Sequence, residues 1–234
     1  MNIRIKFRKT GALRFISHLD VMRYFQKVMR RAEIDICFSE GYSPHMIMSF
    51  ASPLGLGLTS EGEYLDIRIR QAIPSKEALL RMNSVMAEGM EALSFRRLPD
   101  NSKNAMSIVA AADYEVRFRE NCVLPEGWEN VLSDFLEQPE IRIQKETKKG
   151  LQEVDIRPWI YTCSVSDGVI FLQLSAGSVH NLKPELFMKA FASWAGYQIS
   201  SHMLLIHRAE LYANQGSDQK PELISLEELG EDIE

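Results

Sequence analysis

The sequence predicts an α+β protein built from two tandem ferredoxin-like (split βαβ) units, each with an antiparallel sheet. Three observations favour this class. Apolar and polar residues alternate over several short stretches, which indicates strands, and apolar residues recur at helical spacing over longer ones. The order of these elements in residues 1–99 is matched in residues 105–212. Between the two halves, Pro-Asp-Asn-Ser-Lys-Asn at 99–104 breaks all periodicity and predicts a boundary.

The first unit has its clearest helix signal after Ser17, because a serine followed three positions later by an aspartate is a variant of the capping box. At about 100° per residue, Met22, Phe25 and Met29 share one face of this helix, and we expect that face to be buried against the apolar side of the first strand. The predicted elements are a strand at Ile3–Phe7, a helix at His18–Ala32, strands at Ile34–Phe38, Ile47–Ala51 and Tyr64–Arg70, a helix from Pro74 to about Glu88, and a strand at Leu93–Arg97.

The second unit contains a hairpin signal, Ser166-Asp167-Gly168, between two alternating stretches. Pro184 is expected to begin the last helix, because proline is favoured in the first helical turn. The predicted elements are a strand at Asp113–Arg119, a helix at Trp128–Leu136, strands at Ile141–Lys145, Trp159–Val165 and Val169–Leu174, a helix from Pro184 to about Trp194, and a strand at Met203–Tyr212.

The amino-acid composition and the spacing of the cysteines limit the classes of protein to which this chain can belong. The 234 residues are 45% hydrophobic and 25% charged, which is typical of soluble globular proteins. There is no apolar run of the roughly 18 residues that a membrane span needs, and MNIRIKFRKT lacks the apolar core of a signal peptide. Cys37, Cys122 and Cys163 have the spacing of neither a disulfide framework nor a metal site. We therefore expect a cytoplasmic protein with no membrane segment, metal or cofactor.

Charge is unevenly distributed along the chain. Residues 1–60 hold nine Lys and Arg against four Asp and Glu, a net charge of +5, whereas residues 217–234 hold one Lys against seven acids, a net charge of −6. A basic segment favours polyanion binding, although a merely solvated surface has the same composition. Residues 216–234 have too little apolar surface to offset the entropy of ordering, so we expect an acidic tail that is dispensable for folding.

Basic residues fall on the polar face of the first predicted helix. There they would contact the phosphates of an RNA without reading its sequence. The predicted nucleic-acid-binding residues are Arg14, Arg23, Lys27, Arg30 and Arg31. Arg4, Lys6 and Arg8 on the polar face of the first strand would add further phosphate contacts.

Two loops near this helix hold the remaining candidates. If His18 and His45 meet, they could transfer protons near neutral pH as the catalytic pair of a metal-independent ribonuclease. The glycine-rich PLGLGLTSEGE fits no nucleotide-binding motif and favours either a bend or bulge, or a backbone that a partner or RNA can approach closely. The candidate loop and partner surface is Tyr42, Ser43, Gly55, Gly57 and Gly62.

Three stretches resemble a known bacterial family. They are KTGALRFISHLDVMRYFQKVMRRAEI, GYSPHMIMSFASPLGLGLTSEGEYLDI and LSAGSVHNLKPELF. They resemble the radical-SAM-associated (radical-SAM-linked) domain of unknown function, which occurs alone or fused behind a cobalamin-binding radical-SAM protein. That family is often encoded beside a ribonuclease of the E/G type and ribosomal proteins. The resemblance implies a cobalamin-binding radical-SAM protein as partner and a role near RNA or the ribosome.

Three functions remain open at this point. The leading expectation is an accessory protein that binds RNA or presents a substrate to a radical-SAM enzyme during RNA or ribosome modification. The chain lacks the CxxxCxxC that holds the radical-SAM iron–sulfur cluster, so we expect that it is not an enzyme on its own. The alternatives are an endoribonuclease using His18 and His45, and a module that only binds other proteins. Tandem ferredoxin-like units with a glycine-rich segment are also similar in architecture to the CRISPR repeat-RNA-processing endoribonucleases.

Overall fold

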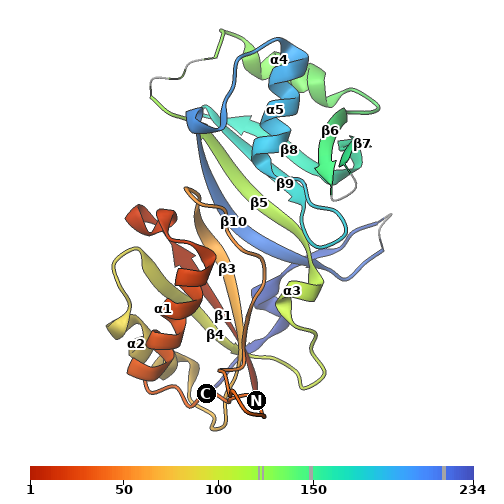
Figure 1. Ribbon diagram of the computed structural model, residues 1–234. Coiled ribbons are helices and arrows are strands. Elements are labelled where there is room, and N and C mark those ends of the chain that lie inside the picture. The colour runs from red at the N-terminus through yellow and green to blue at the C-terminus, as the bar shows by residue number, and fades with distance from the viewer. Residues whose placement is uncertain (121, 123, 148–149, 218–219) are drawn as a thin grey trace. The chain divides into compact units, whose positions relative to one another are not determined.

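The computed structural model describes residues 1–234 except 121, 123, 148–149 and 218–219 (Figure 1). The protein is a mixed α/β chain with a mostly antiparallel sheet and few helices. It divides into two compact units, unit 1 with residues 1–111 and 208–234, and unit 2 with residues 112–207. The chain passes between them within two strands, β5 (Val109–Phe118) and β10 (Leu204–Asn214).

Unit 1 is built around an antiparallel sheet. Its strands lie in the order β12-β4-β1-β3-β10, with β2 also paired to β3 and β11 to β10. The other elements of this unit are β1 (Asn2–Lys9), η1 (Gly11–Phe15), α1 (His18–Arg31), β2 (Met48–Phe50), β3 (Thr59–Arg68), α2 (Ser75–Val85), β4 (Met90–Arg97), α3 (Ala105–Ile108), β11 (Leu223–Ser225), η4 (Leu226–Leu229) and β12 (Glu231–Asp232).

One face of this sheet forms the core with α1 and α2. Ile3, Ile5 and Phe7 of β1 are buried there, as the alternation predicts. Phe25 and Met29 of α1 are fully buried, and the Phe25 ring lies 4.6 Å from that of Phe7 between centroids. The predicted burial of Phe25 and Met29 is confirmed. Met22 is only half-buried at the edge of the core, because Val21 and Val28 occupy more central positions on the helix.

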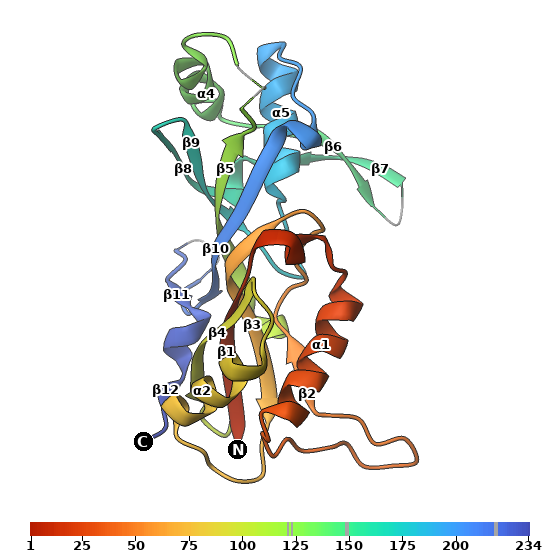
Figure 2. The ribbon, with the colours of Figure 1, turned by 90° about the vertical axis from the view of Figure 1, so that its left-hand side faces the viewer.

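The opposite face of the sheet is covered in part by the C-terminal segment. Figure 2 shows this segment and α1 on opposite sides of β1 and β4. β11 pairs with β10, β12 pairs with β4, and Leu226 in η4 has no exposed surface. The segment expected to be an acidic tail is therefore part of unit 1, because its few apolar residues and its carboxylates find partners on the sheet.

Unit 2 has its own core between two helices and a sheet. Its strands lie in the order β10-β5-β9-β8, and β6 and β7 form a separate hairpin. Phe135 of α4 packs against Phe191 of α5, with ring centroids 5.6 Å apart. The remaining elements are α4 (Trp128–Leu136), β6 (Arg142–Thr147), β7 (Gly150–Asp155), η2 (Arg157–Trp159), β8 (Ile160–Ser166), β9 (Val169–Ser175), α5 (Pro184–Ala195) and η3 (Ser201–Met203). Among the described residues, no helix is long and apolar enough to cross a membrane.

Candidate nucleic-acid interface

The polar face of α1 is exposed along the whole helix. Ser17 caps it, because its Oγ accepts a hydrogen bond from the Asp20 backbone N–H at 3.2 Å. Because the apolar side of the helix packs on the core, the four cations on its opposite side are exposed to solvent. We call them the α1 basic face: Arg23, Lys27, Arg30 and Arg31.

Few acids neutralise the α1 basic face. The Arg23 guanidinium lies 3.7 Å from the Asp20 carboxylate, and both side chains are largely exposed, so this ion pair contributes little. Within the described part of the chain, Lys27, Arg30 and Arg31 have no ion pair. Arg30 and Arg31 lie in the last turn, where the helix dipole favours positive charge. The face therefore offers three unpaired cations and one weakly paired one.

An exposed aromatic side chain precedes α1. Phe15 in η1 is 64% exposed, and the Arg14 guanidinium lies over its ring at 4.8 Å from the centroid. The Arg14 Nε is buried without a hydrogen-bond partner among the described residues. An arginine stacked on an exposed ring is an arrangement that can accept an unpaired base.

η1 is held against the sheet by a buried lysine. Lys9 is 2% exposed, and its Nζ donates to the Ile16 carbonyl oxygen at 3.1 Å. Burial lowers the pKa of Lys9, and the charge of Arg208 lowers it further, while Glu63 acts in the opposite direction. Lys9, the last residue of β1, therefore anchors Ile16, the residue that follows Phe15 and η1.

The three glycines of the candidate partner surface have different roles. Gly57 has φ +85°, a left-handed conformation that favours glycine, and its N–H donates to the Arg14 carbonyl oxygen at 2.9 Å. Gly55 is exposed beside it. Gly62 is buried in β3, and a Cβ there would lie 2.5 Å from the Glu210 Cα. Gly62 therefore permits the close approach of β3 and β10, and the prediction that it belongs to a partner surface is wrong.

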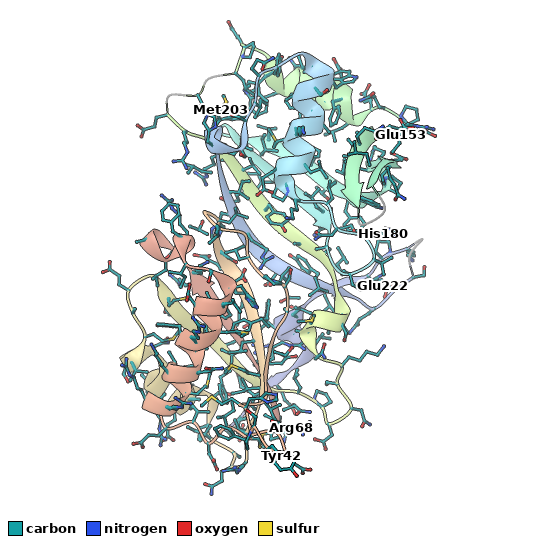
Figure 3. All side chains as sticks on the ribbon, in the orientation of Figure 1. Tyr42, Arg68, Glu153, His180, Met203 and Glu222 are labelled. Atoms are coloured by element: carbon teal, nitrogen blue, oxygen red, sulfur yellow. The ribbon has the colours of Figure 1, made fainter. Side chains whose placement is uncertain are left out.

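The loop before β2 is open to solvent. Tyr42 and Ser43 are exposed, and Tyr42 is labelled at the foot of Figure 3. His45 is also exposed, with its Nδ1 at 2.8 Å from the Ser39 Oγ. All three side chains are therefore accessible to solvent, and the role of Tyr42 and Ser43 in a partner surface stays a prediction.

The two candidate catalytic histidines have different neighbours, and among the described residues they make no hydrogen bond or ring contact with each other. The His18 ring packs on Phe50, with centroids 5.2 Å apart. His45 precedes Phe50 by five positions, and this segment pairs with β3 from Met48 to Phe50. At about 3.3 Å per extended residue, the His45 Cα lies roughly 16 Å from that of Phe50. The geometry therefore gives no shared site to a His18/His45 ribonuclease.

Arg4 and Lys6 of β1 are held by carboxylates and are not available to a polyanion. Arg4 is 2% exposed and makes a two-pronged ion pair with Asp66, at 2.8 and 2.9 Å. Lys6 Nζ contacts the Glu210 and Glu227 carboxylates at 2.8 and 3.0 Å. Burial alone would lower the pKa of Lys6, but these two carboxylates raise it overall. The expectation that Arg4 and Lys6 contact phosphates is wrong, and Arg8 lies 3.2 Å from Glu91.

Sequence reasoning missed the buried ion pair between Arg208 and Glu63. Its N–O distances are 2.6–2.9 Å, and each side chain is at most 6% exposed. Arg208 also donates to the Ser52 carbonyl oxygen at 2.8 Å, which fixes the start of the glycine-rich loop. The partners are 145 positions apart, so no local pattern reveals them. Among the described residues, no group of three or more His, Cys, Asp or Glu side chains could hold a metal ion.

Comparison with known proteins identifies a family. No curated protein matches the chain. A sequence model of the family described as "Uncharacterized protein conserved in bacteria (DUF2344)" matches residues 2–184, which covers most of both units. The chain therefore belongs to this bacterial family of uncharacterized proteins.

Proposed function

We propose that this protein is a cytoplasmic accessory protein that binds RNA, or presents it as a substrate, for a cobalamin-binding radical-SAM enzyme in RNA or ribosome modification. The observation that carries the RNA part is the α1 basic face, whose cations are exposed and largely unpaired. Phosphate neutralisation by such cations is the main source of sequence-independent affinity for RNA.

The neighbouring η1 adds a second kind of contact. Phe15 and Arg14 precede α1 by only a few residues, and most of the Phe15 side chain is exposed. Proteins that bind single strands combine a cationic track with aromatic side chains on which bases stack. We therefore favour single-stranded RNA over a duplex.

The radical-SAM part of the proposal rests on the resemblance of the sequence motifs. Since the chain has no CxxxCxxC, the cluster-binding enzyme has to be a separate protein. The radical-SAM enzyme and its RNA should therefore co-purify with the tagged protein from cells, and sequencing would identify that RNA. If neither the enzyme nor an RNA is recovered, the radical-SAM part of the proposal is contradicted, whereas the RNA part is tested separately.

The RNA part is tested by the salt dependence of binding to a labelled single-stranded RNA. Each phosphate neutralised contributes about −0.7 to the slope of log affinity against log salt. Five contacts, made by Arg14 and the four cations of the α1 basic face, therefore give a slope of about −3.5. The double variant Arg23→Ala/Lys27→Ala should flatten the slope by about 1.4. The matched control is Lys76→Ala/Arg81→Ala, a lysine and an arginine exposed on α2. An equal change in the control, or no binding at low salt with the partner present, would reject the proposal.

A second candidate function is a module that only binds proteins. The observation that favours it is the exposure of three apolar side chains around η1, with Phe15 64%, Leu19 58% and Leu56 65% exposed. Exposed apolar residues in one region are a feature of protein interaction sites. Under this alternative, Phe15→Ala/Leu56→Ala would abolish co-purification of the partner, and the wild-type protein would bind no RNA.

We also propose that each unit is ferredoxin-like. In unit 1 the strands β4-β1-β3-β2 follow the order that the split βαβ arrangement requires, with antiparallel pairs throughout. In unit 2 the strand order β10-β5-β9-β8 corresponds, strand by strand, to the order β4-β1-β3-β2 of unit 1. An experimental structure of each unit would test this assignment.

A further inference from the structure

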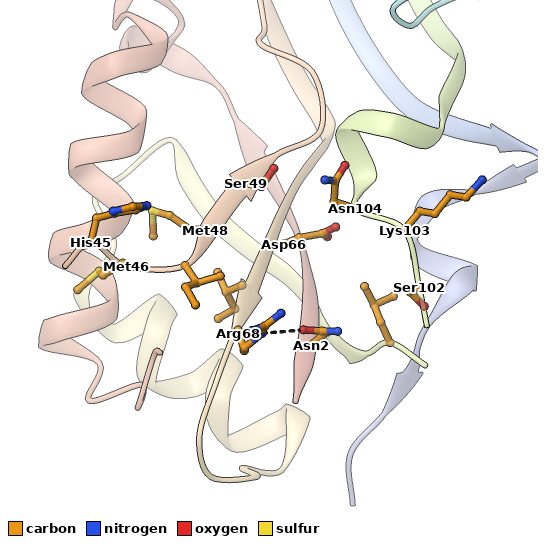
Figure 4. A pocket seen from close by; sticks show the side chains of 13 residues that line it. Asn2, His45, Met46, Met48, Ser49, Asp66, Arg68, Ser102, Lys103 and Asn104 are labelled. Carbon is orange, nitrogen blue, oxygen red and sulfur yellow. Dashed lines mark hydrogen bonds between the residues drawn. The ribbon is translucent and has the colours of Figure 1, made fainter. Parts of the chain in front are cut away.

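A cleft with both polar and apolar lining residues lies on the face of the unit 1 sheet that α1 does not cover. It has a volume of about 400 Å³ and is bounded by β2, β3, the start of β1 and residues 98–104. Figure 4 shows the Arg68 and Asn2 side chains pointing toward each other at its lower end, with Asp66 and Ser49 above them. No sequence motif indicates this cleft, because its residues come from four separate segments.

The polar groups in the cleft are mainly hydrogen-bond donors without partners. Arg68 uses only its Nε, which donates to the Asn2 Oδ1 at 3.3 Å. Its two Nη atoms and the Asn2 Nδ2 have no hydrogen-bond partner in the described part of the chain. The hydroxyls of Ser49 and Ser102 are likewise unbonded there. Unused donors that line one cleft suit a ligand rich in acceptors.

The charge balance of the cleft favours an anion. Asp66 is its only acid, and that carboxylate is neutralised by the two-pronged Arg4 pair and accepts the Ala105 N–H at 2.7 Å. The Arg68 guanidinium has no carboxylate partner among the described residues. Lys103 adds positive charge at the rim, although its side chain extends away from Arg68 in Figure 4. A guanidinium with free Nη atoms matches the geometry of a phosphate group.

The size and the apolar wall indicate what accompanies the phosphate. Ile47 and Leu98 line the cleft beside the donors. Ligand sites commonly have volumes of roughly 300–1,000 Å³, so this one accommodates a molecule of nucleotide size. We propose that the cleft binds a nucleotide-sized phosphate monoester, with its phosphate on Arg68 and Asn2 and its body against Leu98 and Ile47. The source is a free nucleotide or the phosphorylated end of an RNA.

Calorimetric titration of the full chain tests this site. The probes are AMP, adenosine, inorganic phosphate and a trinucleotide RNA with a 5′-phosphate. We expect AMP to bind, phosphate to compete with it, and adenosine to bind at least about tenfold more weakly. If the trinucleotide binds more tightly than AMP, the source is an RNA end, and the reverse order indicates a free nucleotide.

A matched pair of variants assigns the site. Arg68→Gln removes the charge and should weaken AMP binding by about tenfold or more. Arg70→Gln is the control, because Arg70 is exposed nearby but pairs with Asp35 at 3.3 Å and does not line the cleft. Unchanged melting temperatures without ligand would show that both variants fold. Absence of binding of both AMP and the trinucleotide to the wild type at millimolar concentration, or equal binding by Arg68→Gln, overturns the proposal. Arg23→Ala/Lys27→Ala should leave AMP binding unchanged, which separates this site from the α1 basic face.

Discussion

Unit 1 contains two sets of cations that look alike in the sequence and have opposite environments. The α1 basic face lies in solvent and, among the described residues, has only one weak ion pair. Arg4 and Lys6 of β1 are buried or nearly so, and each is bonded to carboxylates. The difference lies in their partners: Asp66, Glu210 and Glu227 are 62, 204 and 221 positions away from the β1 residues that they bind. Whether a basic residue is available to a polyanion therefore depends on which acids the fold places beside it and on how deeply both are buried.

The largest expected effect comes from deleting residues 216–234. This deletion removes Glu227 from Lys6, removes two short strands and exposes the surface that Leu226 covers. Loss of a buried leucine alone costs about 2–5 kcal/mol of the free energy of unfolding, so the deletion should cost more than about 3 kcal/mol. Urea denaturation would measure it, with Leu226→Ala as the smaller companion change. An unchanged midpoint would show that the segment is a dispensable tail.

The second prediction contrasts one cation from each set. Arg4→Ala leaves Asp66 mostly buried without its guanidinium and should cost about 3–5 kcal/mol of the free energy of unfolding. Arg23→Ala on α1 should change it by less than about 0.5 kcal/mol, since that side chain is exposed. Chemical denaturation of both variants measures the contrast. Equal costs would mean that burial does not distinguish the two sets.

Local patterns account for what the sequence predicted well. The helix expected at Trp128–Leu136 is found at those residues, and α1 ends one residue before the expected Ala32. Both helices are specified by apolar spacing, and α1 also by the Ser17 cap, and these signals act within a few positions. The exposure of the α1 basic face follows from the same spacing.

Pairings between distant segments account for what the sequence could not predict. β12 has only two residues, Glu231 and Asp232, and it is a strand because it borders β4. The burial of Arg4, the Arg208–Glu63 pair and the Arg68 cleft depend likewise on which strands become neighbours. The sequence predicts Gly62 in a loop or partner surface, yet its role is set by the Glu210 backbone.

The third prediction concerns acid stability. Burial would raise the pKa of Glu227, but the bond from Lys6 lowers it overall. A carboxyl with a lowered pKa stabilises the fold above its unfolded pKa, near 4.3, and this contribution is lost as the pH falls through the folded pKa. Glu227→Gln should therefore cost about 1 kcal/mol at pH 7 and progressively less below about pH 4. Denaturation series at several pH values test it, and a cost independent of pH would refute the linkage.

The smallest predicted effect concerns Lys27, which has cations on both sides along α1. Arg23 lies four positions before it and Arg31 four positions after it, and like charges at this spacing destabilise a helix by about 0.2–0.5 kcal/mol per pair. Lys27→Ala should therefore raise the free energy of unfolding slightly at low salt, and the gain should fade at about 1 M salt, where charges are screened. The control is Arg81→Ala on α2, which loses a favourable pair with Glu77 and should shift in the opposite direction. Destabilisation by Lys27→Ala at low salt would show that this lysine has a partner within the fold, and would place it with the cations of β1.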